Sequence, residues 1–436
     1  MNDLRVRELE RLDERELRVL LDRRPWLDAD VLATARTIVD DVRERGDAAL
    51  FDCAARFDGV DLRGLGLCVE PAERDAGAAM VPPALQQALS RSLASIRAVH
   101  AAQAVPALQV TSPRPGVWCG ERTTALDSVA LYVPRGRGAF ASVAMMLGVP
   151  ATLAGVDRVV LCTPPGPDGR IDPATLFVAQ QLGIERIVRV GGAQAVAAAA
   201  FGTASLAPVA KFVGPGNVFV AAARALLADT FDTGPACGPS ESVVVADASA
   251  DAGNAAWNLL VEAEHGENSC AVLITDSRAL AEAVVARVRE LLPRLLPGRA
   301  AFAERVLRER GGVLLARDLE AALAFADRFA SEHVALMVRD PWRALERLRN
   351  AGEVLLGDYP IFSLANYAIG CNAILPTGAR ARTQSGVSVR DFQKRTSVAW
   401  LTTEGFADVR EQVVAQSRDE GFSAHHEAVL AWRDAR

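Results

Sequence analysis

The strongest constraint on the fold is an alternation of short apolar runs with Ala- and Leu-rich helical stretches. A first series contains four strand-like runs, at residues 129–133, 158–162, 186–190 and 211–213. After Ser240 a second series contains five more, at residues 242–246, 271–275, 312–315, 334–338 and 354–356. Continuous apolar strands that alternate with helices are typical of parallel sheets buried on both faces. The sequence therefore predicts the α/β class, with two doubly wound units.

Other segments flank these two series. Residues 3–50 carry spaced apolar side chains among many charged ones, as an amphipathic helix does, and Pro25 is expected to break this helix. A similar pattern predicts a helix over residues 83–104. Beyond about residue 377 the chain becomes polar and arginine-rich and then helical, which indicates a separate C-terminal tail.

Composition narrows the class of function. Half of the 436 residues are apolar and 23% are charged, which is a globular balance rather than a disordered one. The net charge of −6 and the lack of a basic segment argue against a nucleic-acid partner. No uninterrupted apolar run reaches about 18 residues, so no membrane-spanning helix is expected. The charged N-terminal residues and the seven scattered cysteines predict a cytoplasmic protein without a disulfide framework.

Three expected strand-to-helix junctions are rich in glycine. They are residues 136–141, which have the spacing of a dinucleotide fingerprint, 191–194 and 214–217. The fingerprint is weak, because no acidic residue ends the strand that follows it. A tight turn that needs glycine explains any one of these loops. Three such loops at one end of one sheet favour a cofactor crevice, where backbone N–H groups bind phosphate or ribose oxygens.

Three clusters of acidic residues and histidines are candidates for chemistry. Glu262 and His265 lie three residues apart on an expected helix, a spacing that offers two metal ligands but is commoner for a surface ion pair. Glu332 and His333 directly precede an apolar strand, where they are either a proton-transfer pair that activates water or an exposed loop pair. Residues 420–426 contain the third cluster, for which a solvated helix face is the alternative.

Six motifs, taken together and in their order, resemble those of the histidinol dehydrogenase family. They are residues 190–198 (VGGAQAVAA), 212–217 (FVGPGN), 238–241 (GPSE), 263–266 (AEHG), 332–333 (EH) and 391–395 (DFQKR). The match extends over nearly the whole chain and is specific for the family, although less so for the substrate. The resemblance implies a homodimer that uses zinc and consumes two NAD to oxidise an alcohol to a carboxylate in two steps.

The resemblance also implies how the chain is divided. Residues 1–25 are expected to form an N-terminal helical segment. A first, discontinuous Rossmann-like domain would combine residues 26–128 with 241–380, and a second, NAD-binding one would span residues 129–240. Both Rossmann-like domains would be incomplete. Residues 381–436 would form a dimerisation tail that crosses to the partner subunit.

The functional residues of the family transfer to the positions that match its motifs. Tyr132, Gln194 and Asn217 would bind NAD. Glu332 would activate water against the aldehyde, and His333 would move the protons of the alcohol and of the hydrate. The remaining site residues would contact the substrate together with His333, and they are Ser240, Glu262, His265, Asn366, Glu420 and His425. Glu420 and His425 would reach into the neighbouring subunit's site.

The expected metal site departs from the family pattern. The family usually binds zinc through Gln, His, Asp and His, whereas the matching residues are Glu262, His265, Asn366 and His425. The two changes are reciprocal, because one amide becomes a carboxylate and one carboxylate becomes an amide. The set keeps one formal negative charge and four nitrogen or oxygen donors, so one Zn²⁺ per subunit is still expected, with altered geometry.

Two further departures concern the substrate. Ala373 stands where the family has a histidine beside the substrate, and Arg135 interrupts the usual Pro-Gly-Gly after the first cofactor strand. These changes fit either a paralogue that oxidises another alcohol or drift within a genuine histidinol enzyme. Two other hypotheses remain open at this stage: a non-catalytic paralogue that keeps the NAD-binding dimer fold, and a zinc hydrolase that uses Glu262, His265 and His425.

Overall fold

The computed structural model of the protein describes residues 4–23, 28–135, 138, 140–235 and 237–432. The chain divides into two compact units. Unit 1 consists of Met1–Gln103 and Asp127–Phe392, and unit 2 of Ala104–Leu126 and Gln393–Arg436. The expected domains stay a prediction, because this coarser division places the N-terminal segment and most of both Rossmann-like domains in unit 1. Residues 104–126 group with the C-terminal segment instead of the first domain, and that segment begins after Phe392 rather than at residue 381.

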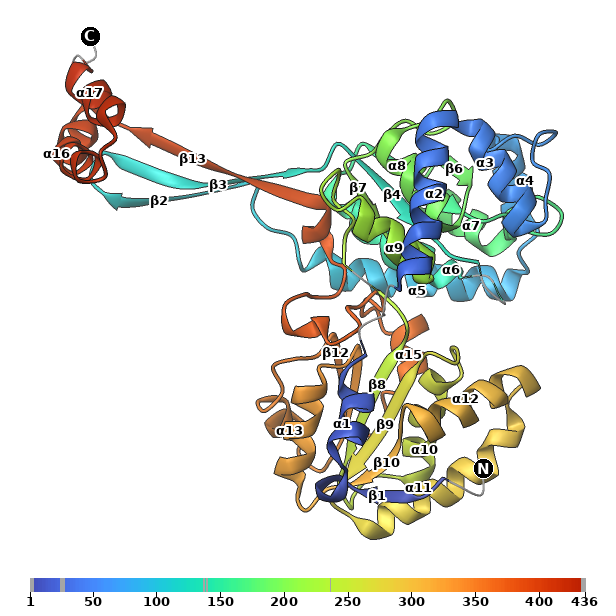
Figure 1. Ribbon diagram of the computed structural model, residues 1–436. Helices are drawn as coiled ribbons and strands as arrows, with labels where there is room; N and C mark the ends of the chain where they lie inside the picture. The colour runs from blue at the N-terminus through green and yellow to red at the C-terminus, as the bar shows by residue number, and fades with distance from the viewer. Residues whose placement is uncertain (1–3, 24–27, 136–137, 139, 236, 433–436) are drawn as a thin grey trace. The chain divides into compact units, whose positions relative to one another are not determined.

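Unit 1 contains a four-stranded parallel sheet with helices on both faces (Figure 1). Its strands lie in the order β6-β5-β4-β7 and are β4 (Ser128–Tyr132), β5 (Arg158–Thr163), β6 (Arg186–Arg189) and β7 (Lys211–Val213). One face packs against α2 (Ala29–Arg45), α3 (Asp47–Cys53), α8 (Gly192–Phe201) and α9 (Val218–Leu226). Four further helices pack against one another: α5 (Pro83–Ala101) and α7 (Pro173–Gln181) pack against α6 (Ala141–Ala154), and α4 (Pro71–Ala79) packs against α7. The strand order reverses between β4 and β7, which is a topological switch point.

Unit 1 also contains a six-stranded parallel sheet in the order β1-β10-β9-β8-β11-β12. Its strands are β1 (Val6–Glu8), β8 (Glu241–Ala246), β9 (Cys270–Thr275), β10 (Gly312–Leu315), β11 (His333–Met337) and β12 (Glu353–Leu356). One face packs against α10 (Ala252–Ala263), α11 (Arg278–Leu291), α12 (Pro297–Glu309) and α15 (Phe362–Tyr367). The other face packs against α1 (Glu14–Leu21), α13 (Leu319–Phe329) and α14 (Pro341–Leu345). Five short helical turns complete the unit: η1 (Leu9–Arg11), η2 (Ala54–Asp58), η3 (Leu292–Arg294), η4 (Arg380–Arg382) and η5 (Val389–Phe392).

The parallel α/β class is confirmed, and so are the nine predicted strands, each within one or two residues. The expectation of one broken helix over residues 3–50 is wrong. Val6 pairs with Val313 at the edge of the six-stranded sheet, and two helices and a further short one follow. Three residues are too few to produce a period-2 pattern that distinguishes a strand from a helix. Pro25, where the break was expected, lies outside the described residues.

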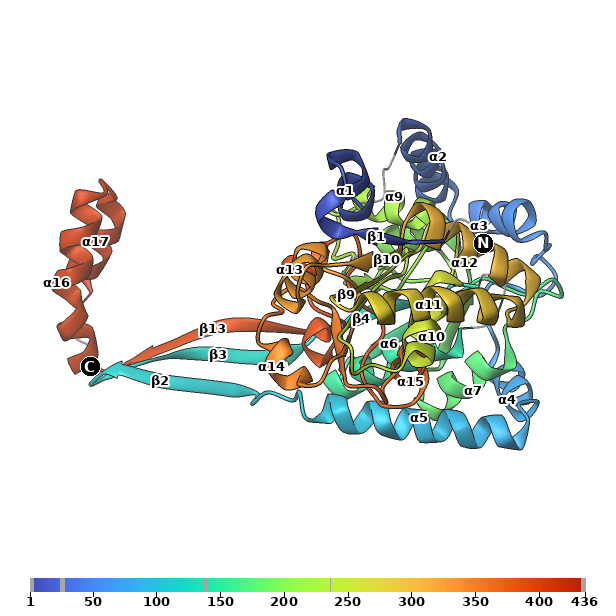
Figure 2. The ribbon, with the colours of Figure 1, turned by 90° about the horizontal axis from the view of Figure 1, so that it is seen from below.

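Unit 2 is a three-stranded antiparallel sheet followed by two helices (Figure 2). The strands lie in the order β13-β3-β2 and are β2 (Leu108–Arg114), β3 (Val117–Ala125) and β13 (Gln393–Leu401). The helices α16 (Thr403–Asp419) and α17 (Ser423–Ala431) pack against each other. The sequence did not predict these strands, because most of their residues are exposed and carry no regular apolar alternation.

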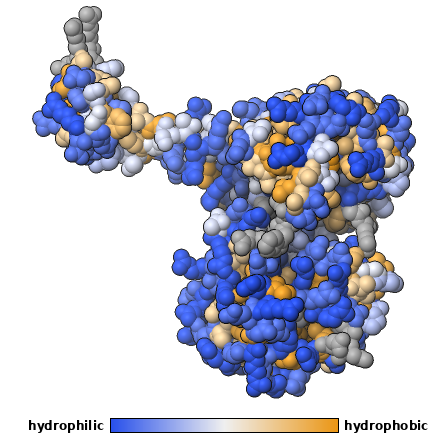
Figure 3. Space-filling view, viewed as in Figure 1, coloured by the Kyte–Doolittle hydropathy of each residue, from blue (hydrophilic) through white to orange (hydrophobic). Residues whose placement is uncertain are grey.

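The described surface is largely hydrophilic, with scattered hydrophobic patches on the face that Figure 3 presents. Among the described residues, no helix has both the length and the apolar character needed to cross a bilayer.

A fully buried arginine connects the four-stranded sheet to residues 66–73. Arg189 at the end of β6 donates to the carbonyl oxygens of Gly169, Gly66 and Cys68 and forms an ion pair with Glu73. Because the Arg189→Met variant leaves Glu73 and three carbonyls without these bonds, we expect the free energy of unfolding to fall by about 3–5 kcal/mol in urea denaturation. The control is Arg186→Met, since Arg186 is exposed on the same strand. A loss below about 1 kcal/mol for Arg189→Met would contradict this role.

Candidate active site

The candidate catalytic residues lie at the amino ends of three neighbouring strands of the six-stranded sheet. Ser240 directly precedes β8, Glu332 directly precedes β11, and His333 is the first residue of β11. Glu353 is the first residue of β12 and is the register partner of His333. Both Glu332 and His333 are buried, at 6% and 3% exposure. The alternative of an exposed loop pair is therefore wrong.

The imidazole of His333 is held from two sides. Its Nδ1 lies 2.9 Å from Oε2 of Glu353. The ring also packs against Phe362, with 5.4 Å between the ring centroids. Burial lowers the pKa of His333, but the charge of Glu262 and the hydrogen bond to Glu353 outweigh burial and raise this pKa to about 9.

Glu332 is oriented by the backbone of the neighbouring strand. Its Oε2 accepts a hydrogen bond of 2.9 Å from the backbone N–H of Glu241, and its Oε1 lies 3.9 Å from Nε2 of His333. Burial raises the pKa of Glu332 to about 8; His333 opposes this rise and Glu262 adds to it. A carboxyl group with such a pKa can both hold and release a proton near neutral pH.

Three of the four predicted metal ligands meet beside this pair. Glu262 lies in the last turn of α10, and its Oε2 is 3.6 Å from Nδ1 of His265. Asn366 of α15 donates to Oε1 of Glu262 at 3.3 Å. Ser240, the predicted substrate contact, has its hydroxyl 2.9 Å from Nδ1 of His265.

The donor set fits a cation. The Glu262 side chain is fully buried, and its Oε2 has no hydrogen-bond partner among the residues that the structure describes. A buried carboxylate oxygen without a partner is costly, and a bound metal ion would satisfy it. The described part of the chain contains no cluster of three His, Cys, Asp or Glu side chains that could hold a metal ion. Glu262 and His265 therefore need Asn366 and a ligand from elsewhere to complete a four-coordinate site.

The predicted NAD residues gather near the switch point of the four-stranded sheet. Tyr132 ends β4, and its hydroxyl accepts a hydrogen bond of 3.1 Å from the backbone N–H of Gly192. Gln194 is buried in the first turn of α8, and its side chain approaches Gly192. Asn217 caps α9, with Oδ1 accepting from the N–H groups of Phe219 and Val220. Tyr132 thus connects the end of β4 to the loop before α8. Gly214, in the loop before α9, lies against the carbonyl oxygen of Tyr132.

Packing within the protein explains the glycines of these loops. A Cβ at Gly214 would lie 2.1 Å from the carbonyl oxygen of Tyr132, and one at Gly216 would lie 2.5 Å from the side chain of Val220. A Cβ at Gly191 would lie 2.4 Å from Pro164. Close packing and tight turns therefore explain these glycines without a cofactor. The prediction that NAD binds here depends instead on the position of Tyr132 and Asn217 beside the switch point. The first glycine loop contains Gly136, which lies outside the described residues.

Two predicted site residues lie in unit 2. Glu420 follows α16, and His425 lies in α17, where it packs against Phe422 with 5.1 Å between the rings. Both residues are exposed. Their participation in a site stays a prediction.

Sequence reasoning missed Glu353. The only indication of a role for Glu353 was that an acidic residue begins an otherwise apolar strand, and an acidic residue there normally marks a strand end that lies in solvent. The structure instead buries Glu353 to 9% exposure, between His333 and the Cys371 thiol. Burial and the Glu353 carboxylate raise the pKa of Cys371, which therefore stays a neutral thiol.

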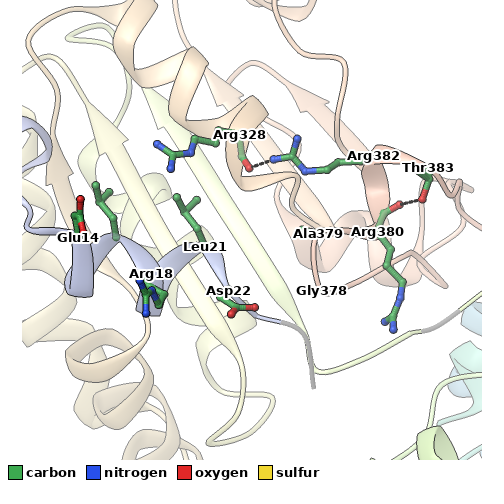
Figure 4. Close-up of a pocket in the computed structure, with 11 residues that line it drawn as sticks. Glu14, Arg18, Leu21, Asp22, Arg328, Gly378, Ala379, Arg380, Arg382 and Thr383 are labelled. Atoms are coloured by element: carbon green, nitrogen blue, oxygen red, sulfur yellow. Dashed lines mark hydrogen bonds between the residues drawn. The ribbon is translucent and has the colours of Figure 1, made fainter. Parts of the chain in front are cut away.

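A separate pocket of about 740 Å³ lies beside α1 (Figure 4). Its lining includes Arg18, Arg328, Arg380 and Arg382. Arg382 donates to the carbonyl oxygen of Arg328. None of the described residues that line the pocket is a predicted site residue, and we assign no ligand to it.

The chain is similar to known proteins along nearly its whole length. The family model described as histidinol dehydrogenase matches residues 22–432. A relative from Synechocystis sp. named histidinol dehydrogenase is 42% identical over 98% of both chains. A relative from Mesorhizobium japonicum named histidinol dehydrogenase homolog 2 is 40% identical over 100% of this chain and 99% of the relative. Relatives of both names are thus about equally similar to this chain.

The fold is similar to that of a solved structure. The crystal structure of histidinol dehydrogenase from Elizabethkingia anophelis superimposes with a TM-score of 0.91. The two sequences are 31% identical, and the match covers 96% of each chain.

Proposed function

Because the chain belongs to the histidinol dehydrogenase family, we propose that it is an oxidoreductase that uses NAD and zinc to oxidise an amino alcohol to the carboxylate through the aldehyde. The substrate is L-histidinol or a related polar alcohol. One observation carries the proposal: Glu332 and His333 are buried and close enough to Glu262 for its charge to act on both, and Oε2 of Glu262 has no hydrogen-bond partner in the described part of the chain. The two doubly wound sheets are proposed to be incomplete Rossmann-like domains, since their strand orders reverse at β4–β7 and β8–β11.

The residues of this chain supply the binding and proton-transfer steps. Zinc held by Glu262, His265 and Asn366, with His425 as the fourth ligand, would lower the pKa of the substrate hydroxyl. NAD would accept one hydride in each oxidation. His333 takes the hydroxyl proton at Nε2, since its Nδ1 is occupied by Glu353.

The second oxidation needs a water molecule. Glu332 removes a proton from this water as the water adds to the aldehyde carbon. His333 returns the proton that it took in the first oxidation to the former carbonyl oxygen, which completes the hydrate and leaves His333 free to act as a base again. His333 then takes a proton from a hydroxyl group of the hydrate while the second hydride leaves. Each oxidation thus transfers one hydride to NAD and one proton to His333. The carboxylic acid that results loses its remaining proton to solvent and is released as the carboxylate.

The test is the formation of NADH by metal-replete protein with NAD and L-histidinol. Two NADH per histidinol are expected if the substrate is L-histidinol. One NADH per histidinol would show that oxidation stops at the aldehyde. No NADH, in protein that binds zinc and NAD, would exclude L-histidinol and direct the assay to other amino alcohols and polar diols.

A non-catalytic role and a hydrolase role predict other results. A binding module has no need of a buried Glu332–His333 pair, whose desolvation costs free energy. A hydrolase has no need of NAD, so calorimetry with NAD separates it from the dehydrogenase. If NAD binds and no alcohol is oxidised by zinc-loaded protein, the non-catalytic role is favoured.

We also propose a homodimer in which Glu420 and His425 act in the neighbouring subunit's site. Four large apolar side chains near Asn366 are exposed, as expected for a surface that another subunit covers: Tyr359, Leu364, Tyr367 and Ile369. Mixed subunits that carry His333→Asn and His425→Asn, refolded together, should regain about a quarter of the wild-type activity for statistical reasons, because half of the dimers then contain one intact site. Each variant alone should be inactive. No recovery, in dimers shown to be mixed, would indicate that His425 acts within its own subunit.

A further inference from the structure

The hydrogen bond between His333 and Glu353 follows from strand register. In the parallel pair β11–β12 the two residues are direct partners, so their side chains project to the same face of the sheet. The backbone N–H of Glu353 also donates to the carbonyl oxygen of Glu332 at 2.9 Å. The carboxyl group of Glu353 is therefore fixed beside Nδ1 of His333 by the same ladder that aligns Glu332.

The two imidazole nitrogens have different neighbours. Nδ1 lies 2.9 Å from Oε2 of Glu353, whereas Nε2 faces Oε1 of Glu332 at 3.9 Å. An ionised carboxylate only accepts hydrogen bonds, so Nδ1 carries the proton in this pair. Nε2 is then the nitrogen with a free lone pair, as a base requires.

We propose that Glu353 is a positioning residue that holds His333 in the Nδ1–H tautomer and directs Nε2 toward the reacting hydroxyl group. This inference rests on the proposed function of His333 as the proton acceptor. Glu353 itself contacts neither the substrate nor the cofactor in this scheme. It acts through the imidazole, as do carboxylates that accept a hydrogen bond from the far ring nitrogen of other functional histidines.

A purely structural ion pair explains Glu353 less well. Apart from His333, its carboxyl group contacts only the Cys371 thiol, which is a weak donor, and its Oε1 is buried without a conventional hydrogen-bond partner among the described residues. A buried carboxylate with one unsatisfied oxygen stabilises a fold less than an apolar side chain of similar size. The rest of β12 is apolar, so an apolar residue at this position would suit packing alone.

The Glu353→Gln variant tests the proposal. A Gln side chain can donate its amide N–H to Nδ1, which favours the Nε2–H tautomer and removes the basic lone pair from Nε2. We expect kcat to fall about 10- to 100-fold, with KM within about twofold of wild type. The Glu353→Asp variant keeps a carboxylate and should recover part of the lost kcat. The control Glu346→Gln makes the same chemical change at an exposed position and should leave kcat unchanged.

The tautomer is measured independently of activity. The chain has only five histidines, and the ¹⁵N signals of His333 are identified as those missing from His333→Asn. Above about pH 9, the imidazole of His333 is neutral. Under these conditions the expected result is Nδ1–H in wild type and Glu353→Asp, and a shift toward Nε2–H in Glu353→Gln. An unchanged tautomer, or an unchanged kcat with an altered tautomer, would overturn the proposal. If wild-type protein oxidises no alcohol, the proposed function fails, whereas the tautomer still decides whether Glu353 orients His333.

Discussion

The His333→Asn variant is expected to lose about 10²–10⁴-fold in kcat while it still binds NAD. Asn has neither a basic ring nitrogen nor a charge that changes near neutral pH, so the side chain at this position could not accept the hydroxyl proton. Asn is also smaller, and it leaves the contact with Phe362 and the carboxyl group of Glu353 unfilled. The measurement is steady-state NADH formation together with calorimetric titration of NAD, both on zinc-loaded protein.

The control for this variant is His426→Asn, the same substitution at a histidine that the proposed mechanism does not use. It should retain wild-type kcat. Unchanged turnover in His333→Asn would remove His333 from the mechanism. Loss of NAD binding in His333→Asn would show instead that the substitution disturbs the fold of unit 1, and circular dichroism would then reveal the disturbance.

The Glu262→Gln variant should lose zinc. Glu262 is the only carboxylate among the four predicted ligands, so the substitution removes the one formal negative charge that faces the cation. We expect the affinity for zinc to fall at least about 100-fold, and turnover to fall with it. Zinc content after dialysis, and calorimetric titration of the metal-free protein with zinc, measure the effect without reference to activity.

The reciprocal substitution provides a rescue. Adding Asn366→Asp to Glu262→Gln produces the ligand set that the resemblance assigns to the family. Asn366 already lies within 3.3 Å of Glu262, so the new carboxylate occupies the same site as the old one. The double variant should regain most of the zinc affinity. If Glu262→Gln keeps its zinc, Glu262 is not a ligand, and if the double variant binds no better than Glu262→Gln, the two positions do not compensate for each other.

Much of unit 1 could be predicted because its strands are buried on both faces. Runs such as residues 129–133 and 243–246 are continuously apolar, and this pattern can be recognised without any knowledge of their neighbours. Strands β2 and β13 of unit 2 are exposed over most of their length. Their sequences therefore carry no regular pattern of apolar residues from which a strand could be predicted.

Most residues of the candidate site were proposed from the motif match, but neither their burial nor their charged contacts could be predicted. The motif match located Glu332 and His333, but spacing alone left open whether the pair is buried or exposed. Burial depends on α10 and α15, which cover that face of the sheet and are distant in sequence. Glu353 was missed for the same reason, since its contact with His333 depends on the register of β11 against β12.

The sheet of unit 2 has a consequence for biosynthesis. Strand β3 pairs along its whole length with β13, and Ala125 faces Gln393, about 270 residues later in the chain. At roughly 5–20 residues per second, the ribosome takes on the order of 10–50 s to deliver that partner. During this interval the nascent hairpin presents an unpaired edge together with the exposed Leu108 and Val110. Translation speed and chaperone supply should therefore influence the yield of soluble protein.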